Sequence, residues 1–318
     1  MDQLLETYRE AGRIIKSIFE EVEKVIVGQR TVLEQILIAM LCNGHALIES
    51  YPGLGKTLTV STLAKITDLK FSRIQCTPDL MPSDITGTYI VEEHDGKKVF
   101  RFEKGPIFAN IVLADEINRA SPKTQSAMLE CMQERQVTVG NETHILDRPF
   151  FVLATQNPIE MEGTYPLPEA QLDRFLMKIL IDYPAPNDEK AIIDRYTGNV
   201  LPAVKPVIKK ETLIALQQLT REVPVSEDIK QYVLKIVTAT RNAKQHHIEY
   251  GASPRASIGL ILAAKARALT HGRNYVSRED IEATAYPVLR HRIILTFEAE
   301  RRGITKDQVI AEILKQAR

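Results

Sequence analysis

Apolar residues at helical spacing mark the first segment of the chain. Between residues 4 and 24 they recur three or four positions apart, which predicts an amphipathic helix. A turn is expected over 25–29 and a second helix over 30–42. From residue 46 the pattern changes, because short uninterrupted apolar runs then alternate with helical stretches.

Five of these apolar runs predict strands. They lie at residues 46–48, 71–76, 111–114, 150–155 and 175–181. Apolar strands separated by helices are typical of a parallel sheet that is covered by helices on both faces. We therefore expect an α/β domain over residues 1–184.

The remaining residues, 185–318, follow a different pattern. Pro184 and Pro186 stand at the change, and prolines this close together fit neither a strand nor the interior of a helix. Beyond them no further strand-like run follows. Helical periodicity instead covers residues 213–219, 229–241, 255–271 and 278–289. We expect a small all-helical second domain.

Composition and charge exclude several classes of protein. The 318 residues carry 41 Lys+Arg and 41 Asp+Glu, so no overall basic field favours nucleic acid. The basic run at 290–292 is interpreted as salt-bridging. No apolar run approaches the roughly 20 residues that a membrane span needs, and the acidic N-terminus does not resemble a secretory signal. Cys42, Cys76 and Cys131 lack metal-ligand spacing, which favours reduced core thiols in a cytoplasmic protein.

A glycine-rich turn follows the first apolar run and opens a helix at Lys56 and Thr57. Gly53 and Gly55 allow backbone N–H groups to converge on a polyphosphate, and the helix N-terminus adds partial positive charge. Lys56 would reach the β- and γ-phosphates, and the Thr57 hydroxyl would bind Mg²⁺. The loop departs from the usual pattern at Ser50, where a glycine is expected, so the strength of nucleotide binding stays open. The simpler alternative is a structural turn.

Polar residues end two later strand-like runs. Asp115 would orient Mg²⁺, and Glu116 would act as a general base on the attacking water. Asn157 could hydrogen-bond the γ-phosphate or that water. Strand ends in such sheets converge at the ligand crevice, which favours these roles over solvated strand ends and an ordinary Asn–Pro turn.

Two arginines are candidates for contact with a triphosphate. Arg174 could supply charge to a nucleotide bound by a neighbouring subunit, or could pair at the surface with Glu169 or Asp173. A serine and a proline before Arg255 predict a helix start, which places Arg255 on the first helical turn. A cation at that end of a helix is mildly unfavourable. We therefore expect Arg255 to sense the γ-phosphate across an interdomain cleft.

Taken in order, these elements resemble the AAA+ ATPases and, more narrowly, the MoxR family. The resemblance covers nearly the whole chain. Its most specific stretches are Thr-Pro-Asp-Leu-Met-Pro-Ser-Asp-Ile-Thr-Gly at 77–87 and Ala-Asp-Glu-Ile-Asn-Arg-Ala at 114–120. Further matches lie at 26–29, 52–57, 154–158 and 251–255.

The resemblance implies a hexameric ring that binds ATP or ADP with Mg²⁺ at subunit interfaces. It implies that Arg174 is the arginine finger, which contacts the nucleotide of a neighbouring subunit. It also implies that Arg255 is the arginine of the lid domain that senses the γ-phosphate. The family remodels client proteins in the manner of a chaperone and helps to activate metalloenzymes, often beside a partner with a von Willebrand factor A domain. The nucleotide-binding residues expected in all are Val27, Gly28, Pro52, Gly53, Leu54, Gly55, Lys56, Thr57, Leu58 and Arg255.

Our leading hypothesis is a Mg²⁺-dependent ATPase. Lys56 and Arg255 hold phosphates and Glu116 activates water. Asn157 positions that water, and Arg174 acts on a neighbouring subunit. One alternative is a nucleic-acid motor or loader, which would show salt-dependent stimulation of turnover. Another is a module that binds nucleotide and scarcely hydrolyses it. Two hairpins are expected over 89–102 and 137–146. In related ring ATPases such hairpins face the pore or the partner, and the alternative is a pair of plain edge hairpins.

Overall fold

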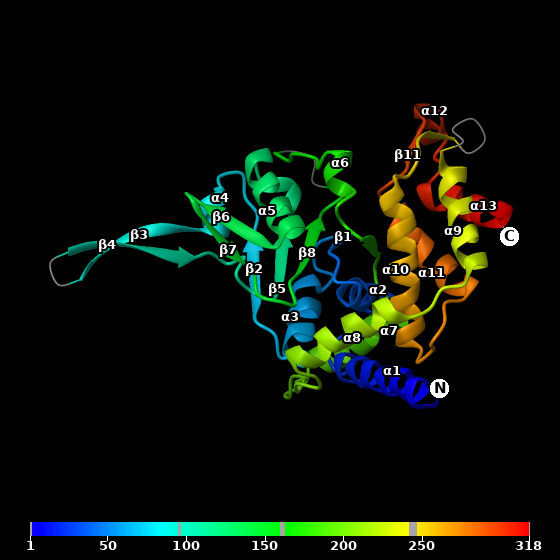
Figure 1. The fold of residues 1–318 in the computed structure, drawn as a ribbon, viewed down its shortest axis with the longest axis horizontal. Helices are drawn as coiled ribbons and strands as arrows, with labels where there is room; N and C mark the ends of the chain where they lie inside the picture. Colours follow the sequence, from blue (N-terminus) through cyan, green and yellow to red (C-terminus); the bar gives the residue numbers. More distant parts are fainter. Residues whose placement is uncertain (1, 95–96, 160–162, 242–246, 318) are drawn as a thin grey trace.

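The computed structural model describes residues 2–94, 97–159, 163–241 and 247–317. A five-stranded sheet forms the centre of the N-terminal part (Figure 1), in the order β2-β5-β8-β1-β9. Every neighbouring pair is parallel, so all carboxyl ends lie at one edge. The strands are β1 (Ala46–Ser50), β2 (Phe71–Gln75), β5 (Ile111–Asp115), β8 (Phe151–Gln156) and β9 (Met177–Ile181).

Helices cover both faces of the sheet, as the uninterrupted apolar strands predict. Along β5, Ile111 and Leu113 join a core with the helices on one face, and Val112 and Ala114 join a core with α5 on the other. This alternation follows from the two-residue period of a strand. The covering helices are α1 (Asp2–Val22), α2 (Arg30–Leu41), α3 (Lys56–Ile66) and α5 (Pro122–Glu134).

The C-terminal helices are organised around α10, which packs against α8, α9 and α11 and also against α1 and α2. One hydrophobic core therefore runs from the sheet into the C-terminal part. The division at residues 184 and 185 stays a prediction. The helices are α8 (Lys210–Glu222), α9 (Glu227–Thr240), α10 (Pro254–Thr270), α11 (Arg278–Leu289), α12 (Phe297–Arg301) and α13 (Lys306–Ala317).

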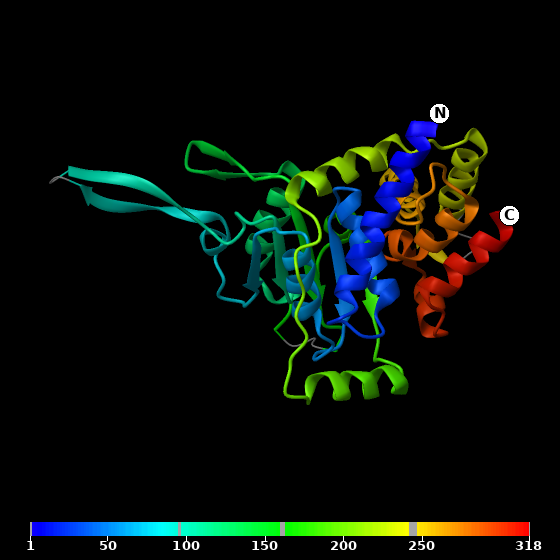
Figure 2. The same ribbon diagram turned by 90° about the horizontal axis from the view of Figure 1, so that it is seen from below.

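Two features differ from the sequence-based expectation. Pro186 does not merely break the pattern: it is the first residue of α7 (Pro186–Tyr196), where its missing N–H is tolerated. The C-terminal part also contains two short antiparallel strands, β10 (Ile248–Tyr250) and β11 (Ile294–Leu295), besides its helices. In Figure 2, α7 lies apart from the other C-terminal helices.

Both expected hairpins are present and project from the sheet on the same side (Figures 1 and 2). The turn predicted at 95–96 lies outside the described residues. None of the described helices is long and apolar enough to span a bilayer. The hairpins are β3 (Gly87–His94) with β4 (Lys97–Lys104) and β6 (Gln136–Val139) with β7 (Glu142–Ile145). The remaining short elements are α4 (Pro82–Thr86), η1 (Ile117–Arg119) and α6 (Glu169–Leu172).

Candidate nucleotide-binding site

The glycine-rich loop joins the carboxyl end of β1 to the N-terminus of α3. Gly53 and Gly55 have φ angles of 81° and 75°, and a Cβ at either would meet nothing within 4 Å. Open space above glycines at a helix N-terminus suits a bound phosphate chain. Ser50 is a strand residue paired with Ile181 and has no positive φ, so serine at this position strains no backbone.

Beside the loop is a mostly apolar cavity of about 250 Å³. It brings Val27 together with Gly53, Leu54, Gly55 and Leu58, all of which the sequence analysis assigned to nucleotide binding. The other residues that line it were not predicted from sequence. These are Val25, Ile26, Gln29, Thr59, Pro184, Ile192 and Tyr196.

Gln29 carries an unpartnered acceptor at this cavity. Its Nε2 donates to the carbonyl oxygen of Leu54 (3.2 Å). Its Oε1 is buried and has no hydrogen-bond partner among the described residues. Buried polar atoms without a partner are uncommon, and an exocyclic amino group such as that of adenine is a donor of the kind it lacks.

Helix α7 closes one side of the cavity with Ile192 and Tyr196. The Tyr196 hydroxyl donates to the carbonyl oxygen of Val25 (2.9 Å), which fixes α7 against the segment before α2. Gly28, with a φ of 72°, allows α7 to approach, because a Cβ there would lie 2.5 Å from Asp188 Cγ. Gly28 therefore shapes the cavity although it does not line it.

Asp115 stands at the carboxyl end of β5 and is nearly buried. Arg73 on β2 donates to its Oδ2 from Nη2 (2.6 Å) and Nε (3.2 Å). Thr155 Oγ1 donates to Asp115 Oδ1 (2.7 Å) and accepts from the backbone N–H of Glu116 (2.8 Å). Thr155 therefore fixes both acids relative to β8.

Glu116 has a φ of 57°, in the left-handed region. Such backbone strain in a residue other than glycine is typical of functional sites. Its Oε2 accepts from Gln75 Nε2 (3.0 Å) and from Arg119 Nη1 (3.2 Å). Gln75 was not among the predicted site residues, although its place at the end of β2 was a usable signal.

Asn157 comes directly after β8, which lies between β5 and β1. The register that pairs Ala114 with Ala154 and Glu49 with Gln156 brings Asn157 to the same edge as Glu116 and the loop. Asn157 is 5% exposed, and its Oδ1 accepts from the backbone N–H of Ile159 (3.3 Å). The predicted convergence of strand ends is therefore present.

Two oxygen-bearing side chains at this edge are candidates for holding a magnesium ion. Among the described residues, no group of three or more His, Cys, Asp or Glu side chains could hold a metal. Mg²⁺ at phosphate sites commonly takes one or two protein ligands and completes its shell with water and phosphate oxygens. Thr57, the second residue of α3, and Asp115 are the residues that would hold it.

Arg174 and Arg255 lie at the opposite edge of the sheet. Leu176 N donates to the carbonyl oxygen of His45 (2.8 Å), immediately before β1 and β9 begin. Arg174 is therefore separated from the Lys56 loop by the length of β1, about 15 Å at strand spacing. Arg255 Nη1 lies 3.8 Å from Asp173 Oδ2, so it shares this edge.

This placement changes the expectation for Arg255. The structure brings Arg255 together with Arg174 and not with Lys56, so Arg255 does not cover a phosphate bound by its own loop. Both arginines line one cavity of about 260 Å³, with Arg221 and Arg292. The sequence correctly predicted that Arg255 lies on the first turn of a helix. Which edge of the sheet that helix, α10, approaches is set by its packing against other helices.

A parallel sheet with a glycine-rich loop after its β1 strand, two acids ending β5 and a helical C-terminal part defines a P-loop protein of the AAA+ class.

Comparison with known proteins narrows this class. Residues 45–177 match the family described as "ATPase family associated with various cellular activities (AAA)", and residues 240–313 match the AAA lid domain. The chain is 46% identical over 313 residues to Chaperone MoxR1 of Mycobacterium tuberculosis, covering 96% of this chain and 82% of that protein. It is 30% identical to Protein MoxR of Methylorubrum extorquens, covering 98% and 96%.

A crystal structure of a predicted ATPase from Cytophaga hutchinsonii has a similar fold. Its TM-score is 0.90 at 47% identity, and the match covers 99% of this chain and 96% of that one. The chain belongs to the MoxR family of AAA+ ATPases, which confirms the family and fold expected from the motifs.

Proposed function

We propose that the protein is a Mg²⁺-dependent ATPase that remodels or activates partner proteins, including metalloenzyme complexes. The single observation that carries the ATPase assignment is the apolar cavity beside Gly53 and Gly55 at the N-terminus of α3. An adenine base in that cavity would direct its phosphates along the loop toward Lys56. Similarity to one relative named as a chaperone, MoxR1, supports a protein client.

The acids at the carboxyl edge supply the proposed chemistry. Mg²⁺, when bound, supplies positive charge beside the phosphate oxygens. Glu116 takes a proton from the attacking water, and Asn157 orients that water through its amide. Gln75 and Arg119, which donate to the Glu116 carboxylate, hold it in place. Lys56 neutralises the charge that develops on the β- and γ-phosphates.

The cations at the amino edge complete the proposed site from a second copy of the chain. Arg174 and Arg255 line one cavity and are both exposed at its surface, Arg255 by 49%. Neither can reach the Lys56 loop of its own chain. A head-to-tail ring, which we propose to be a hexamer, would bring the amino edge of one copy to the carboxyl edge of the next.

Two further parts of the proposal concern the cellular compartment and the partner protein. Cys42, Cys76 and Cys131 are free and buried, and burial raises the pKa of each thiol, which supports a reducing compartment such as the cytoplasm. A protein with a von Willebrand factor A domain is the partner that we expect beside the client.

A pair of lysine variants on α3 tests the ATPase assignment. Lys56→Ala should abolish the heat of Mg²⁺–ADP binding in calorimetry, because the phosphates lose their cation. Lys65→Ala, an exposed lysine on the last turn of the same helix, is the matched control and should bind normally. Normal binding by Lys56→Ala would contradict the assignment. Tight binding without turnover by the parent chain would instead support a nucleotide-responsive module.

A further inference from the structure

The turn that carries Arg174 is held by the C-terminal helices. Asp173 Oδ1 accepts from Arg292 Nε (2.8 Å), and Asp173 Oδ2 accepts from the hydroxyl of Ser253 (2.9 Å). Ser253 caps α10 and Arg292 follows α11, so one carboxylate joins both helices to the turn. The Arg292 side chain is 3% exposed and that of Asp173 is 20% exposed.

Arg292 also fixes the backbone of this turn. Its guanidinium donates to the carbonyl oxygens of Phe175 (2.6 Å) and Leu176 (3.0 Å). His291 Nε2 forms a further hydrogen bond to the Phe175 carbonyl (2.9 Å). A planar guanidinium presents its N–H groups in fixed directions. The orientation of the turn is therefore set by residues of the C-terminal part.

Apolar packing ties α10 to the same turn without charge. Leu176 lies against Gly259 of α10, where a Cβ would approach Leu176 Cδ1 to 3.3 Å. On its other side Leu176 faces Gly44, where a Cβ would lie 2.9 Å from Leu176 Cβ. Since Arg255 is on the first turn of α10, the close approach of this helix sets the spacing between Arg255 and Arg174.

We propose that Asp173 and Arg292 form a buried clamp that positions Arg174 and Arg255 as one unit. This inference rests on the proposed function, in which both arginines meet the nucleotide of a neighbouring copy. Because the clamp joins the turn to α10 and α11, movement of these helices carries both arginines together. Asp173 and Arg292 are positioning residues, which act through the two arginines and not on the nucleotide.

The clamp predicts a separation between binding and turnover. Asp173→Asn keeps the size of the side chain and removes its charge. Its Kd for Mg²⁺–ADP should stay within about twofold of the parent, and its KM for ATP should change little. Its kcat should fall about tenfold or more, because misplaced arginines no longer stabilise the transition state. Arg292→Lys, which keeps the charge but loses the fork, should behave similarly.

Mixing two inactive variants tests the clamp directly. Lys56→Ala has an intact clamp and no functional loop, whereas Asp173→Asn has the reverse. In mixed rings, some sites combine the loop of an Asp173→Asn subunit with the arginines of a Lys56→Ala subunit. Turnover should therefore return at about a quarter of the sites when subunits mix at random. A defect in overall folding, or an effect on the chain's own nucleotide, would not be rescued in this way.

Two controls separate the clamp from the proposed function. Arg174→Ala mixed with Lys56→Ala should also recover turnover. Recovery there but not with Asp173→Asn would overturn the clamp, and no recovery in either mixture would overturn the trans arrangement itself. Asp280→Asn, which removes another carboxylate held between two arginines but far from Arg174, should keep its turnover.

Ser253→Gly extends the test if Asp173→Asn does not fold. Glycine is accepted at a helix N-cap, so α10 should still form, while the hydrogen bond to Asp173 is lost. We expect the same pattern at smaller size, a kcat about threefold lower with unchanged nucleotide affinity. Full turnover by a folded Ser253→Gly together with full turnover by Arg292→Lys would overturn the proposal.

Discussion

The two edges of the central sheet carry opposite chemistry. The carboxyl edge carries the glycine-rich loop, with open space above Gly53 and Gly55, an apolar cavity beside that loop, and the acids Asp115 and Glu116 at the end of β5. At the amino edge, Arg174 and Arg255 line a second cavity in which Asp173 is the acidic residue. The first edge suits a nucleotide with its magnesium, and the second suits the anionic phosphates of such a nucleotide.

This difference explains why one copy of the chain holds only part of the proposed site. The edges face away from each other across the length of β1, so no side-chain movement brings Arg174 to Lys56 of the same chain. In the proposed head-to-tail assembly, the amino edge of one copy meets the carboxyl edge of the next, and such contacts form a ring where the rotation closes. In that proposed assembly, the separation of the arginines from the loop would link each bound nucleotide to the neighbouring copy.

The largest expected effects come from one residue at each edge. Glu116→Gln and Arg174→Ala should each lower steady-state ATP turnover by about a thousandfold. Both should retain nucleotide binding, because neither removes the loop or the apolar cavity. Turnover is measured at saturating Mg²⁺–ATP, with Lys65→Ala as the control. If turnover falls in Glu116→Gln but not in Arg174→Ala, the chemistry is confined to the carboxyl edge.

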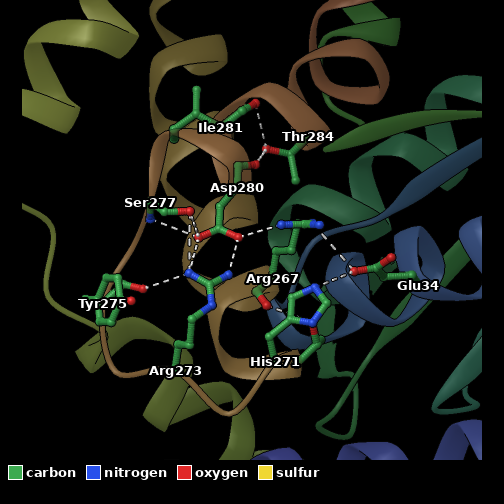
Figure 3. A network of polar contacts seen from close by, with 10 residues as sticks. Glu34, Arg267, His271, Arg273, Tyr275, Ser277, Asp280, Ile281 and Thr284 are labelled. Atoms are coloured by element: carbon green, nitrogen blue, oxygen red, sulfur yellow. Dashed lines mark hydrogen bonds and ion pairs between the residues drawn. The ribbon is translucent and has the colours of Figure 1, made fainter.

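A buried carboxylate away from both edges sharpens the comparison. Asp280 is fully buried, and Figure 3 shows it between Arg267 and Arg273 beside Ser277. Removing one partner of a buried ion pair costs about 3 kcal/mol. Asp280→Asn should therefore lower the free energy of unfolding in urea by about that amount.

This same variant should leave turnover per folded molecule unchanged. Arg267 continues from Asp280 toward Glu34 of α2, with Nε 3.6 Å from Glu34 Oε1, so the network joins α10 to α2 and not to the turn of Arg174 (Figure 3). A large fall in turnover without a fall in stability would show that this network also positions the arginines.

The amino edge should also give the protein a pH-dependent stability. Burial lowers the pKa of His45 to about 4, and the charge of Arg135 adds to this shift, whereas the hydrogen bond from Nε2 to the carbonyl oxygen of Met132 opposes it. Nδ1 accepts from the backbone N–H of Val152, so Nε2 is the nitrogen that carries the proton. The unfolded chain takes up this proton below about pH 6.5, and the folded chain does so only below about pH 4.

His45 alone should therefore lower the free energy of unfolding by about 3 kcal/mol as the pH is reduced from about 6.5 to about 4. Urea unfolding of the parent and of His45→Gln over this range measures the difference. Glutamine keeps one donor and one acceptor but does not titrate, so its curve should be flatter. Equal slopes for the two proteins would remove His45 as the cause.

Two glycines give the smallest and most selective test. Gly28→Ala would place a Cβ 2.5 Å from Asp188 Cγ at a φ of 72°, which should displace α7 and weaken ADP binding by about 1 kcal/mol. Gly259→Ala would place a Cβ 3.3 Å from Leu176 and Val288, and should lower kcat about twofold to fivefold with unchanged ADP binding. Calorimetry and turnover measurements on both variants check this. Lower kcat with normal ADP binding in Gly28→Ala, together with weaker ADP binding in Gly259→Ala, would reverse the roles of the two edges.

The carboxyl edge was largely predictable from sequence. Asp115 and Asn157 each end an apolar strand, and parallel strands bring such ends together whatever the rest of the chain does. The glycine-rich loop is local, so its residues specify its shape. Two features of this edge could not be predicted from sequence, namely the contact of Gln75 with Glu116 and the position of α7 over the cavity. Both depend on residues that are far apart along the chain. The acids that follow Pro186 were an unused sign of a helix start.

The amino edge was predicted in its residues and not in its geometry. Ser253 does cap a helix that carries Arg255, as its sequence position indicates. Which edge that helix approaches depends on how α10 packs against α1, α2 and α8, and no local pattern encodes this. The basic run at 290–292 was expected to form salt bridges. It does so through Asp173 and Asp307, and it also binds the carbonyls of the Arg174 turn.

Nucleotide binding by two variants, one at each edge, tests the central claim most directly. Calorimetry with Mg²⁺–ADP compares Lys56→Ala with the double variant Arg174→Ala/Arg255→Ala. The account predicts no measurable binding by the first and a Kd within about twofold of the parent for the second, because the arginines serve another copy's nucleotide. Loss of binding by the double variant, with retention by Lys56→Ala, would contradict it.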